Sequence, residues 1–457
     1  MFDDPNLVSS AGLVPVVALA ESAGLGALAQ EHLSVPTDKG ANAGLKVTSV
    51  VAGMVAGADS IDDMSLLRHG GMSRVFARAY APSTLGSFLR AFTFGHVRQL
   101  DAVASRFLTA LADQTPLLGR PRAETAETGH ALVDVDDTII EVHGYAKQGA
   151  GFGYSGVRGL NALLATATTT DTAPVVVAQR LRKGSCGSPR GARRLVADAL
   201  KTTRALTDAK PLVRADSAFY GRGLVGAAVR AGADVSVTAR MDPKVKAAIT
   251  TIGDDAWVSI EYTDAVFEEA TGRWISRAEV AEIDFTAFAG QRKADRVPGR
   301  LVVRRIPDLN PRSTGGQETL FDTWRFHAFF TTTDPDVLDT VAADKTHHGH
   351  AIIEQVHADL KNSAMAHLPS GSFAANAAWL VLAVIAFNLT RAAATLTGPA
   401  LAKATTATVR RKLITVPARL ASSARRITLH LPSAWPWEEA WNRMFNHGCG
   451  PPTAARN

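Results

Sequence analysis

The sequence predicts an α/β protein in which a sheet of mixed strand direction follows a helical N-terminal region and contains a β-rich insertion. Up to about residue 125, apolar residues recur at helical spacing. From about residue 130, short runs rich in β-branched residues alternate with helical segments, and between about residues 243 and 320 short β-type pieces are separated by turn-rich stretches. A chain of 457 residues is long enough for two or three such units.

The N-terminal domain, residues 1–125, is expected to be a helical bundle. Leu13–Ala29 and Val47–Val55 are apolar at helical spacing, and Pro82 followed by two hydroxyl residues is typical of a helix start. Arginines between Arg68 and Arg98 would give the bundle a basic face. We expect this domain to bind DNA, and a solvated basic surface is the alternative explanation.

Residues 126–242 are expected to supply the first part of the sheet. The predicted strands are Ala131–Val142, 152–165, Ala173–Leu181, Leu212–Ala215 and Asp234–Ala239, with helices near 189–206 and 221–231. This order of three strands, helix, strand, helix and strand indicates a sheet with both parallel and antiparallel neighbours.

The chain then leaves the sheet and returns to it. Residues 243–323 are the predicted β-rich insertion, and residues 324–395 rejoin the sheet through a strand at Arg325–Thr331. A helix spanning 345–363 and a buried apolar helix at Ala377–Leu389 follow. The second run holds 13 residues, and a membrane span needs roughly 20, so we expect no membrane association.

The remaining region, residues 396–457, is basic. The whole chain has a formal charge of +6, and from Arg391 to Asn457 there are ten Lys or Arg against two Glu. Lys and Arg that neutralise phosphates release counterions, so this region suits a nucleic acid, with a solvated tail as the alternative. Cys186 and Cys449 have neither metal-ligand nor disulfide spacing, and the N-terminus lacks a cationic leader, which favours the cytoplasm.

Three acidic residues stand where metal chemistry would need them. Asp136 lies on the first strand, Asp216 ends a later strand, and Glu354 is expected in the middle of the helix at 345–363. Two divalent ions held by such carboxylates can activate the attacking oxygen and stabilise the leaving oxygen of a phosphodiester. Asp134 leaves the strand on the same face as Asp136 and is therefore a rival first ligand.

The motifs around these acids resemble those of the DDE transposases of bacterial insertion sequences, in the group whose RNase H-like domain carries a β-rich insertion. The family's Asp-x-Thr is matched by Asp136-Asp137-Thr138, and its strand-end Asp by Asp216. Its helix spaces Tyr, Arg, Glu and Lys by two, three and six residues. Glu354 and Lys361 keep the last spacing, whereas His350 and His347 stand at the Arg and Tyr positions.

The resemblance implies an RNase H-like fold and a transposase that cleaves and joins DNA at the terminal inverted repeats of an insertion sequence. Two Mg²⁺ (or Mn²⁺) ions would bind Asp136, Asp216 and Glu354, while Lys361, His350 and His347 would contact DNA phosphates. It further implies double-stranded DNA partners (the terminal repeats and the target), a homodimer and a bacterial cytoplasmic location. Trp324 could stack on a flipped base, with a core tryptophan as the alternative.

Two other functions stay open from the sequence. Asp134-Val135-Asp136-Asp137-Thr138 also fits the first motif of haloacid-dehalogenase-like phosphatases, with Asp134 as nucleophile and Asp136 as general acid. A catalytically inactive, DNA-binding transposase relative is the second. The GxGxxG at Gly151–Gly156 lacks the strand, turn and helix of a dinucleotide site, so we interpret it as part of a hairpin.

Overall fold

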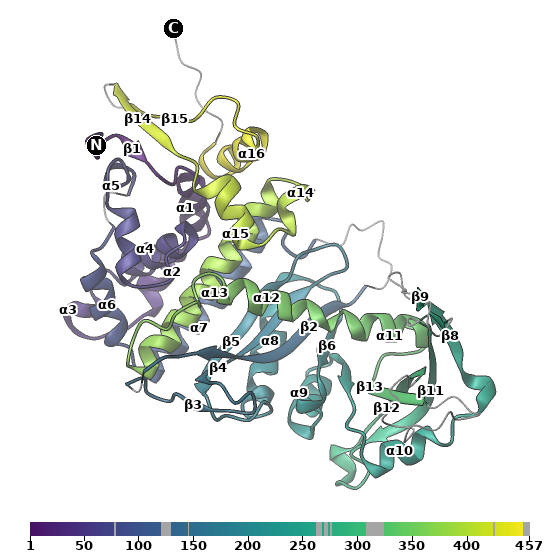
Figure 1. Ribbon diagram of the computed structural model, residues 1–457. Helices are drawn as coiled ribbons and strands as arrows, with labels where there is room; N and C mark the ends of the chain where they lie inside the picture. Colours follow the sequence, from purple (N-terminus) through teal and green to yellow (C-terminus); the bar gives the residue numbers. More distant parts are fainter. Residues whose placement is uncertain are drawn as a thin grey trace.

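A ten-stranded sheet forms the centre of the computed structural model, which describes residues 1–76, 79–119, 129–144, 146–261, 267–268, 273–274, 277–307, 324–423 and 426–450 (Figure 1). The strand order is β3-β4-β2-β6-β7-β13-β12-β11-β8, and β5 also pairs with β4. The strands are β2 (Ala131–Glu141), β3 (Gly151–Phe152), β4 (Arg158–Thr168), β5 (Val175–Lys183), β6 (Pro211–Ala215), β7 (Asp234–Thr238), β8 (Val258–Glu261), β11 (Arg277–Ala287), β12 (Val297–Pro307) and β13 (Trp324–Thr331).

Strand direction changes at β2. β4 pairs antiparallel with β2 and with β5, while β6 and β7 run parallel to β2. The parallel pairs need crossover connections, which are the helices α8 (Ala192–Leu206) and α9 (Arg222–Arg230). The mixed α/β fold is therefore confirmed. The short strand β3 pairs antiparallel with β4, which also confirms the hairpin interpretation of the glycine motif.

The β-rich insertion continues the central sheet instead of forming a separate one. β13 pairs antiparallel with β7, and β12, β11 and β8 extend the sheet outward from there. The insertion also holds α10 (Pro243–Ile249) and the two-stranded pair β9 (Phe267–Glu268) and β10 (Arg273–Trp274). In Figure 1 these strands form the end of the molecule farthest from the N-terminal helices.

Helix α13 (Phe373–Leu396) is the central helix of the hydrophobic core. At 24 residues it is longer than the predicted apolar run and is long and apolar enough to cross a membrane, but 89% of its most apolar window is buried inside the protein. Asn388 on this helix donates to the carbonyl of Val176 and accepts from its amide, at 2.8 and 2.9 Å. These bonds cover backbone groups of β5 at the sheet edge.

The N-terminal helices pack on α13, and the two ends of the chain meet. The helices are α1 (Leu13–Ser22), α2 (Leu25–His32), α3 (Thr37–Gly40), α4 (Ala43–Ala56), α5 (Met72–Val75), α6 (Pro82–Arg90) and α7 (Phe94–Gln114). β1 (Leu7–Val8) pairs with β14 (Ala418–Ser423), which pairs with β15 (Arg426–His430). One hydrophobic core runs through these helices, the sheet and α16 (Glu438–Cys449).

The predicted domain limits stay predictions. The limit at 125/126 falls at residues outside the described part of the chain, and the limit at 323/324 falls where the described part resumes with β13. The short helices α14 (Pro399–Ala402) and α15 (Thr406–Val409) follow α13 within the predicted C-terminal region.

The single helix expected over 345–363 is wrong, because the chain breaks there into two helices. α11 (Thr340–His348) packs on β11 and β12 of the insertion, and α12 (Ile352–Lys361) packs on β2. A short 3-10 turn at Gly349–Ala351 joins them. Glu354 consequently lies in the first turn of α12, exposed, and not in the middle of a long helix.

Candidate active site

Two of the predicted ligands are brought together by the parallel pairing of β2 with β6. Val135 pairs with Ala215, so Asp136 and Asp216 are the next residues on neighbouring strands. Adjacent strands lie about 4.8 Å apart, which places the two carboxylates side by side. Asp136 is held by the amide of Asp137, which donates to Oδ1 at 2.7 Å, and Asp216 by the amide of Ala218 at 3.0 Å.

The surroundings of this pair disfavour negative charge in the absence of a cation. Burial, assisted by the nearby carboxylates of Asp216 and Asp137, raises the pKa of Asp136 to about 6. Partial burial also raises the pKa of Asp216, although this residue is more exposed than Asp136. His350 opposes both shifts. A bound cation would remove the penalty that burial and mutual repulsion impose on the charged forms.

The carboxylate of Asp134 is bonded to other side chains of the protein, unlike that of Asp136. It is fully buried, and the Arg214 guanidinium donates to both of its oxygens at 2.7 Å. His350 Nδ1 lies 3.0 Å from Asp134 Oδ1. A carboxylate held by a bidentate arginine and a histidine has little capacity left to hold a metal ion or act as a nucleophile.

Arg214 also fastens the helix break to the sheet. Its guanidinium donates to the carbonyls of Thr346 and Gly349, at the end of α11 and in the turn before α12. A Cβ at position 349 would lie 2.8 Å from Arg214 Nη1, so a glycine is needed for this approach. Asp134, Arg214 and His350 together form a buried clip that positions α12 over β2.

Glu354 lies on the helix that packs on β2, on the face that carries residues contacting the aspartates of that strand. His350, Glu354, His357 and Lys361 are spaced by three or four residues and therefore follow one face of the helix. His350 contacts Asp134, and His357 Nδ1 lies 3.6 Å from Asp136 Oδ2. Partial burial lowers the pKa of Lys361, while Asp136 opposes that shift.

His357 is a residue at the site that the sequence analysis missed. It is buried, and its Nε2 has no hydrogen-bond partner in the described part of the chain. Burial lowers its pKa to about 4, so the ring is neutral at physiological pH. Its position three residues after Glu354 is the one sequence signal that could have indicated it.

The other side of β2 is closed by a separate polar cluster. Arg182 donates to Asp137 at 2.5 Å and to the side-chain oxygen of Asn161 at 2.6 and 2.8 Å. Because Asp137 is paired in this way, it is a structural neighbour of Asp136 and a weaker candidate ligand.

The chemistry of the donor set fits divalent metal ions. Asp136, Asp216 and Glu354 offer the hard oxygen atoms that Mg²⁺ or Mn²⁺ prefers, and a cation would offset the burial that raises the pKa of the two aspartates. As the side chains stand, no three His, Cys, Asp or Glu side chains among the described residues are close enough to hold one ion.

Two of the predicted DNA-contacting residues, His347 and Trp324, are engaged with other side chains of the protein. His347 is buried, with its ring nitrogens 2.9 Å from Ser236 Oγ and 3.0 Å from Thr238 Oγ1, and it stacks on Phe329. It therefore has no ring nitrogen free for a phosphate. Trp324 is half-buried on β13, and the Arg305 guanidinium lies 4.5 Å from the centre of its ring.

Some of the cations counted from Arg391 onward have partners inside the protein. Arg391 is buried and donates to the carbonyls of Ala402 and Ala404, and Arg419 pairs with Asp4 at 3.3 Å. Lys412 lies over the ring of Trp437 at 4.9 Å. The excess of cations counted from the sequence is consequently larger than the set that can meet a polyanion.

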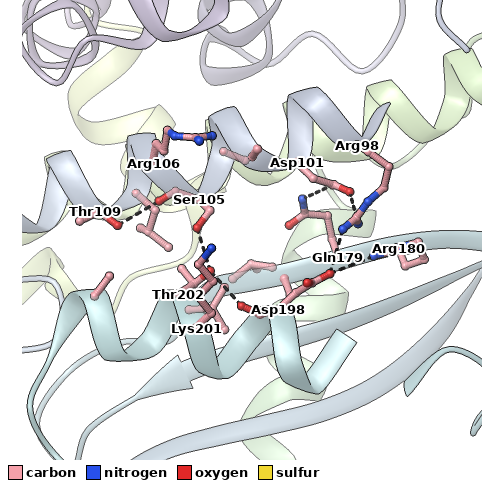
Figure 2. A pocket seen from close by; sticks show the side chains of 17 residues that line it. Arg98, Asp101, Ser105, Arg106, Thr109, Gln179, Arg180, Asp198, Lys201 and Thr202 are labelled. Carbon is pink, nitrogen blue, oxygen red and sulfur yellow. Dashed lines mark hydrogen bonds and ion pairs between the residues drawn. The ribbon is translucent and has the colours of Figure 1, made fainter. Parts of the chain in front are cut away.

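A cavity of about 400 Å³ lies apart from the carboxylates, between α7, β5 and α8 (Figure 2). Figure 2 shows five of its side chains turned toward one another: Arg98, Asp101, Gln179, Arg180 and Asp198. Arg98 pairs with Asp101 at 2.7 Å and with Asp198 at 3.1 Å, and Arg180 pairs with Asp198 at 3.3 Å. Burial raises the pKa of Asp101 to about 6. These ion pairs connect α7 to α8 and to β5, so we interpret them as stabilising the fold.

The phosphatase alternative does not agree with this architecture. The strand that next pairs with β2 along the chain is β4, and this pairing is antiparallel. Such phosphatases need a parallel strand at that point. Asp134, the nucleophile in that interpretation, is saturated by Arg214.

Comparisons with known proteins identify a family for the chain. The family model described as "Transposase DDE domain group 1" matches residues 1–447. A solved structure, described as the piggyBac transposase synaptic complex with hairpin DNA, is similar with a TM-score of 0.39 and 10% identity. That similarity covers 90% of this chain and 73% of the other. None of the curated proteins is a match.

Proposed function

The chain belongs to the transposases with a DDE domain of group 1, and we propose that it cleaves and joins DNA at the terminal inverted repeats of an insertion sequence. DDE transposases are enzymes that act on DNA and use divalent metal ions. The observation that carries the finer proposal is the register of β2 and β6, which sets Asp136 beside Asp216 below the helix that bears Glu354.

In this proposal Asp136, Asp216 and Glu354 hold two Mg²⁺ or Mn²⁺ ions. When bound, such ions activate the attacking oxygen and stabilise the leaving oxygen of a phosphodiester. The protein supplies the positions of these groups: the bonds to the amides of Asp137 and Ala218 orient the two aspartates, and the clip orients α12. No protein nucleophile is required, because water and then a DNA 3′-OH attack phosphorus.

Phosphate binding falls to Lys361 and His350. Lys361 is on the face of α12 that carries Glu354, and the charge of Asp136 raises its pKa against the effect of burial. His350 binds Asp134 through Nδ1, and we assign the phosphate contact to its Nε2. His347 is left out of this role because both of its ring nitrogens are bonded to hydroxyl groups.

The remaining partners follow from the reaction. Two transposon ends must be held together, so we propose a homodimer on double-stranded DNA in the bacterial cytoplasm. The N-terminal helices and the cations of the C-terminal region that are free of internal partners would grip the repeats and the target.

Cleavage of a labelled duplex that carries the element's end tests this proposal. We expect nicking at the repeat boundary in Mg²⁺ or Mn²⁺, lost in EDTA and in Glu354→Gln, with DNA binding retained by the variant. If the variant cleaves as the wild type does, Glu354 has no catalytic role. If neither protein cleaves while both bind DNA, the chain is an inactive, DNA-binding relative.

A further inference from the structure

A wide cleft opens beside the proposed catalytic carboxylates. Its volume is about 880 Å³, and its lining includes Asp137 and the residues of β2 that follow it, together with Lys361. Ligand sites generally have volumes of about 300 to 1,000 Å³. The cleft shares Lys361 with the proposed active site and extends away from it, and no step described above uses the rest of it.

An aromatic side chain stands unused at this cleft. Tyr154, in the loop between β3 and β4, lines the cleft and is fully exposed, at 109% of its reference area. The neighbouring Gly153 lies against Ile139, three residues after Asp136 on β2. Since a strand rises about 3.3 Å per residue, the base of the loop is about 10 Å along the strand from the catalytic carboxylate.

The loop that carries Tyr154 has a firm base. β3 pairs with β4 through Gly151 and Gly159, and the Gly184 amide donates to the Gly149 carbonyl at 3.0 Å. A Cβ at Gly153 would lie 2.6 Å from the Gly184 carbonyl oxygen. Such close backbone packing restrains the base of the loop, which keeps the backbone of Tyr154 at the rim of the cleft.

The polar lining suits an anion that also carries hydroxyl or amide groups. Lys361 and Lys147 bring positive charge, and the Lys147 ammonium also donates to the carbonyls of Leu368 and Ser370. Of the two carboxylates in the lining, Asp137 is neutralised by Arg182, and Glu141 is exposed at the end of β2. The hydroxyl groups of three serines line the same cleft: Ser155, Ser185 and Ser188. A flat exposed ring, cations and hydroxyls together match the base, phosphate and sugar of a nucleotide.

We propose that this cleft binds an unpaired nucleotide of the DNA strand next to the cleavage point, with its base stacked on Tyr154 and its phosphate near Lys361. The inference rests on the proposed function, because only a DNA-cleaving site would place strand ends there. It assigns the stacking role to Tyr154 and not to Trp324, whose ring is covered on one face by Arg305. Base–aromatic stacking tolerates any base, so this contact would favour strand separation regardless of sequence.

Binding of the full-length protein to two random-sequence duplexes tests the inference. One duplex is blunt and the other carries a short single-stranded extension, and both are titrated at fixed salt in EDTA, so that no cleavage occurs. We expect the wild type to prefer the extended duplex by about 5- to 150-fold, the range that stacking of one base provides. Tyr154→Ala should lose that preference and Tyr154→Phe should keep it.

Phe152 provides the matched control. It is also exposed, at 66%, and lies on the same hairpin, but the described residues that line the cleft do not include it. Phe152→Ala should therefore keep the preference for the extended duplex. An iodouracil in the extension should cross-link to the peptide that contains Tyr154.

The outcomes separate this inference from the proposed function. An unchanged preference in Tyr154→Ala, an equal loss in Phe152→Ala, or no preference in the wild type would overturn the role of Tyr154, even if metal-dependent cleavage is intact. Conversely, a Tyr154-dependent preference in a protein that does not cleave would support the cleft and count against the catalytic assignment.

Discussion

Replacing Asp136 by Asn should stabilise the metal-free protein at neutral pH, although it removes a proposed metal ligand. The folded protein holds the pKa of Asp136 at about 6, against 3.8 for an unperturbed Asp, and its side chain is 22% exposed. The wild type therefore loses stability as pH rises from about 4 to about 6, because the unfolded chain ionises first. A difference of about two pKa units corresponds to about 3 kcal/mol.

The neutral amide of Asp136→Asn avoids this loss and can still accept the bond from the Asp137 amide. We expect the free energy of unfolding in EDTA to be higher than in the wild type by up to about 3 kcal/mol at pH 8. The difference should vanish near pH 4. Urea titrations at pH 4, 6 and 8 measure it, and adding Mg²⁺ should stabilise the wild type more than the variant.

Asp134→Asn is the matched control, two residues away on the same strand face. It leaves the Arg214 guanidinium buried without its counter-charge, which should lower the stability by about 3 to 5 kcal/mol. The two substitutions are chemically identical, so opposite signs would come from their surroundings alone. If Asp136→Asn were as destabilising as Asp134→Asn at pH 8, the description of Asp136 as a carboxylate lacking its cation would be wrong.

Three further substitutions separate DNA contacts from structural residues. Lys361→Met should weaken duplex binding and reduce the slope of log affinity against log salt by about one, and an unchanged slope would remove Lys361 from the phosphate contacts. His347→Ala leaves the hydroxyls of Ser236 and Thr238 without their partner. The free energy of unfolding in urea should therefore fall by about 2 to 4 kcal/mol, while the affinity for DNA stays unchanged. Weaker DNA binding at unchanged stability would contradict this. Arg214→Lys keeps the charge but loses the bidentate fork, so we expect lower cleavage and a stability loss of about 1.5 to 3 kcal/mol, and full cleavage activity would refute the clip.

The sequence predicted the sheet well where local patterns decide the structure. The alternating β-branched run of β2 begins at the predicted residue, and Asp216 directly follows β6, as expected. Strand direction followed from chain order, because consecutive short strands favour antiparallel pairing and intervening helices favour parallel pairing.

The sequence analysis missed the pairing of Asp134 and the burial of His347, because both depend on which strands become neighbours. Asp134 and Arg214 are paired by the register of β2 and β6, 80 residues apart in the chain. No local pattern in the sequence reveals that Asp134 is neutralised, so Asp134 stayed a rival to Asp136 as the first ligand. His347 was judged from its spacing to Glu354, whereas its burial comes from packing on β7 and β13.

The break between α11 and α12 also depends on a residue that is distant in the sequence. Gly349 inside a helical run was a local signal for a break, but its reason is the guanidinium of Arg214 lodged against it. Because α11 packs on the insertion strands and α12 packs on β2, the break also sets the position of α12 relative to β2.

The most direct test of the metal site is to change the ligand and the ion together. Asp136→Cys and Asp216→Cys replace a hard oxygen by sulfur, which Mg²⁺ accepts poorly and Mn²⁺ tolerates better. With the labelled transposon end, we expect both variants to be inactive in Mg²⁺ and to recover part of their cleavage in Mn²⁺, while Ser217→Cys, next to Asp216, stays active in both. Full cleavage by the two variants in Mg²⁺ would show that Asp136 and Asp216 do not bind the catalytic metal ions.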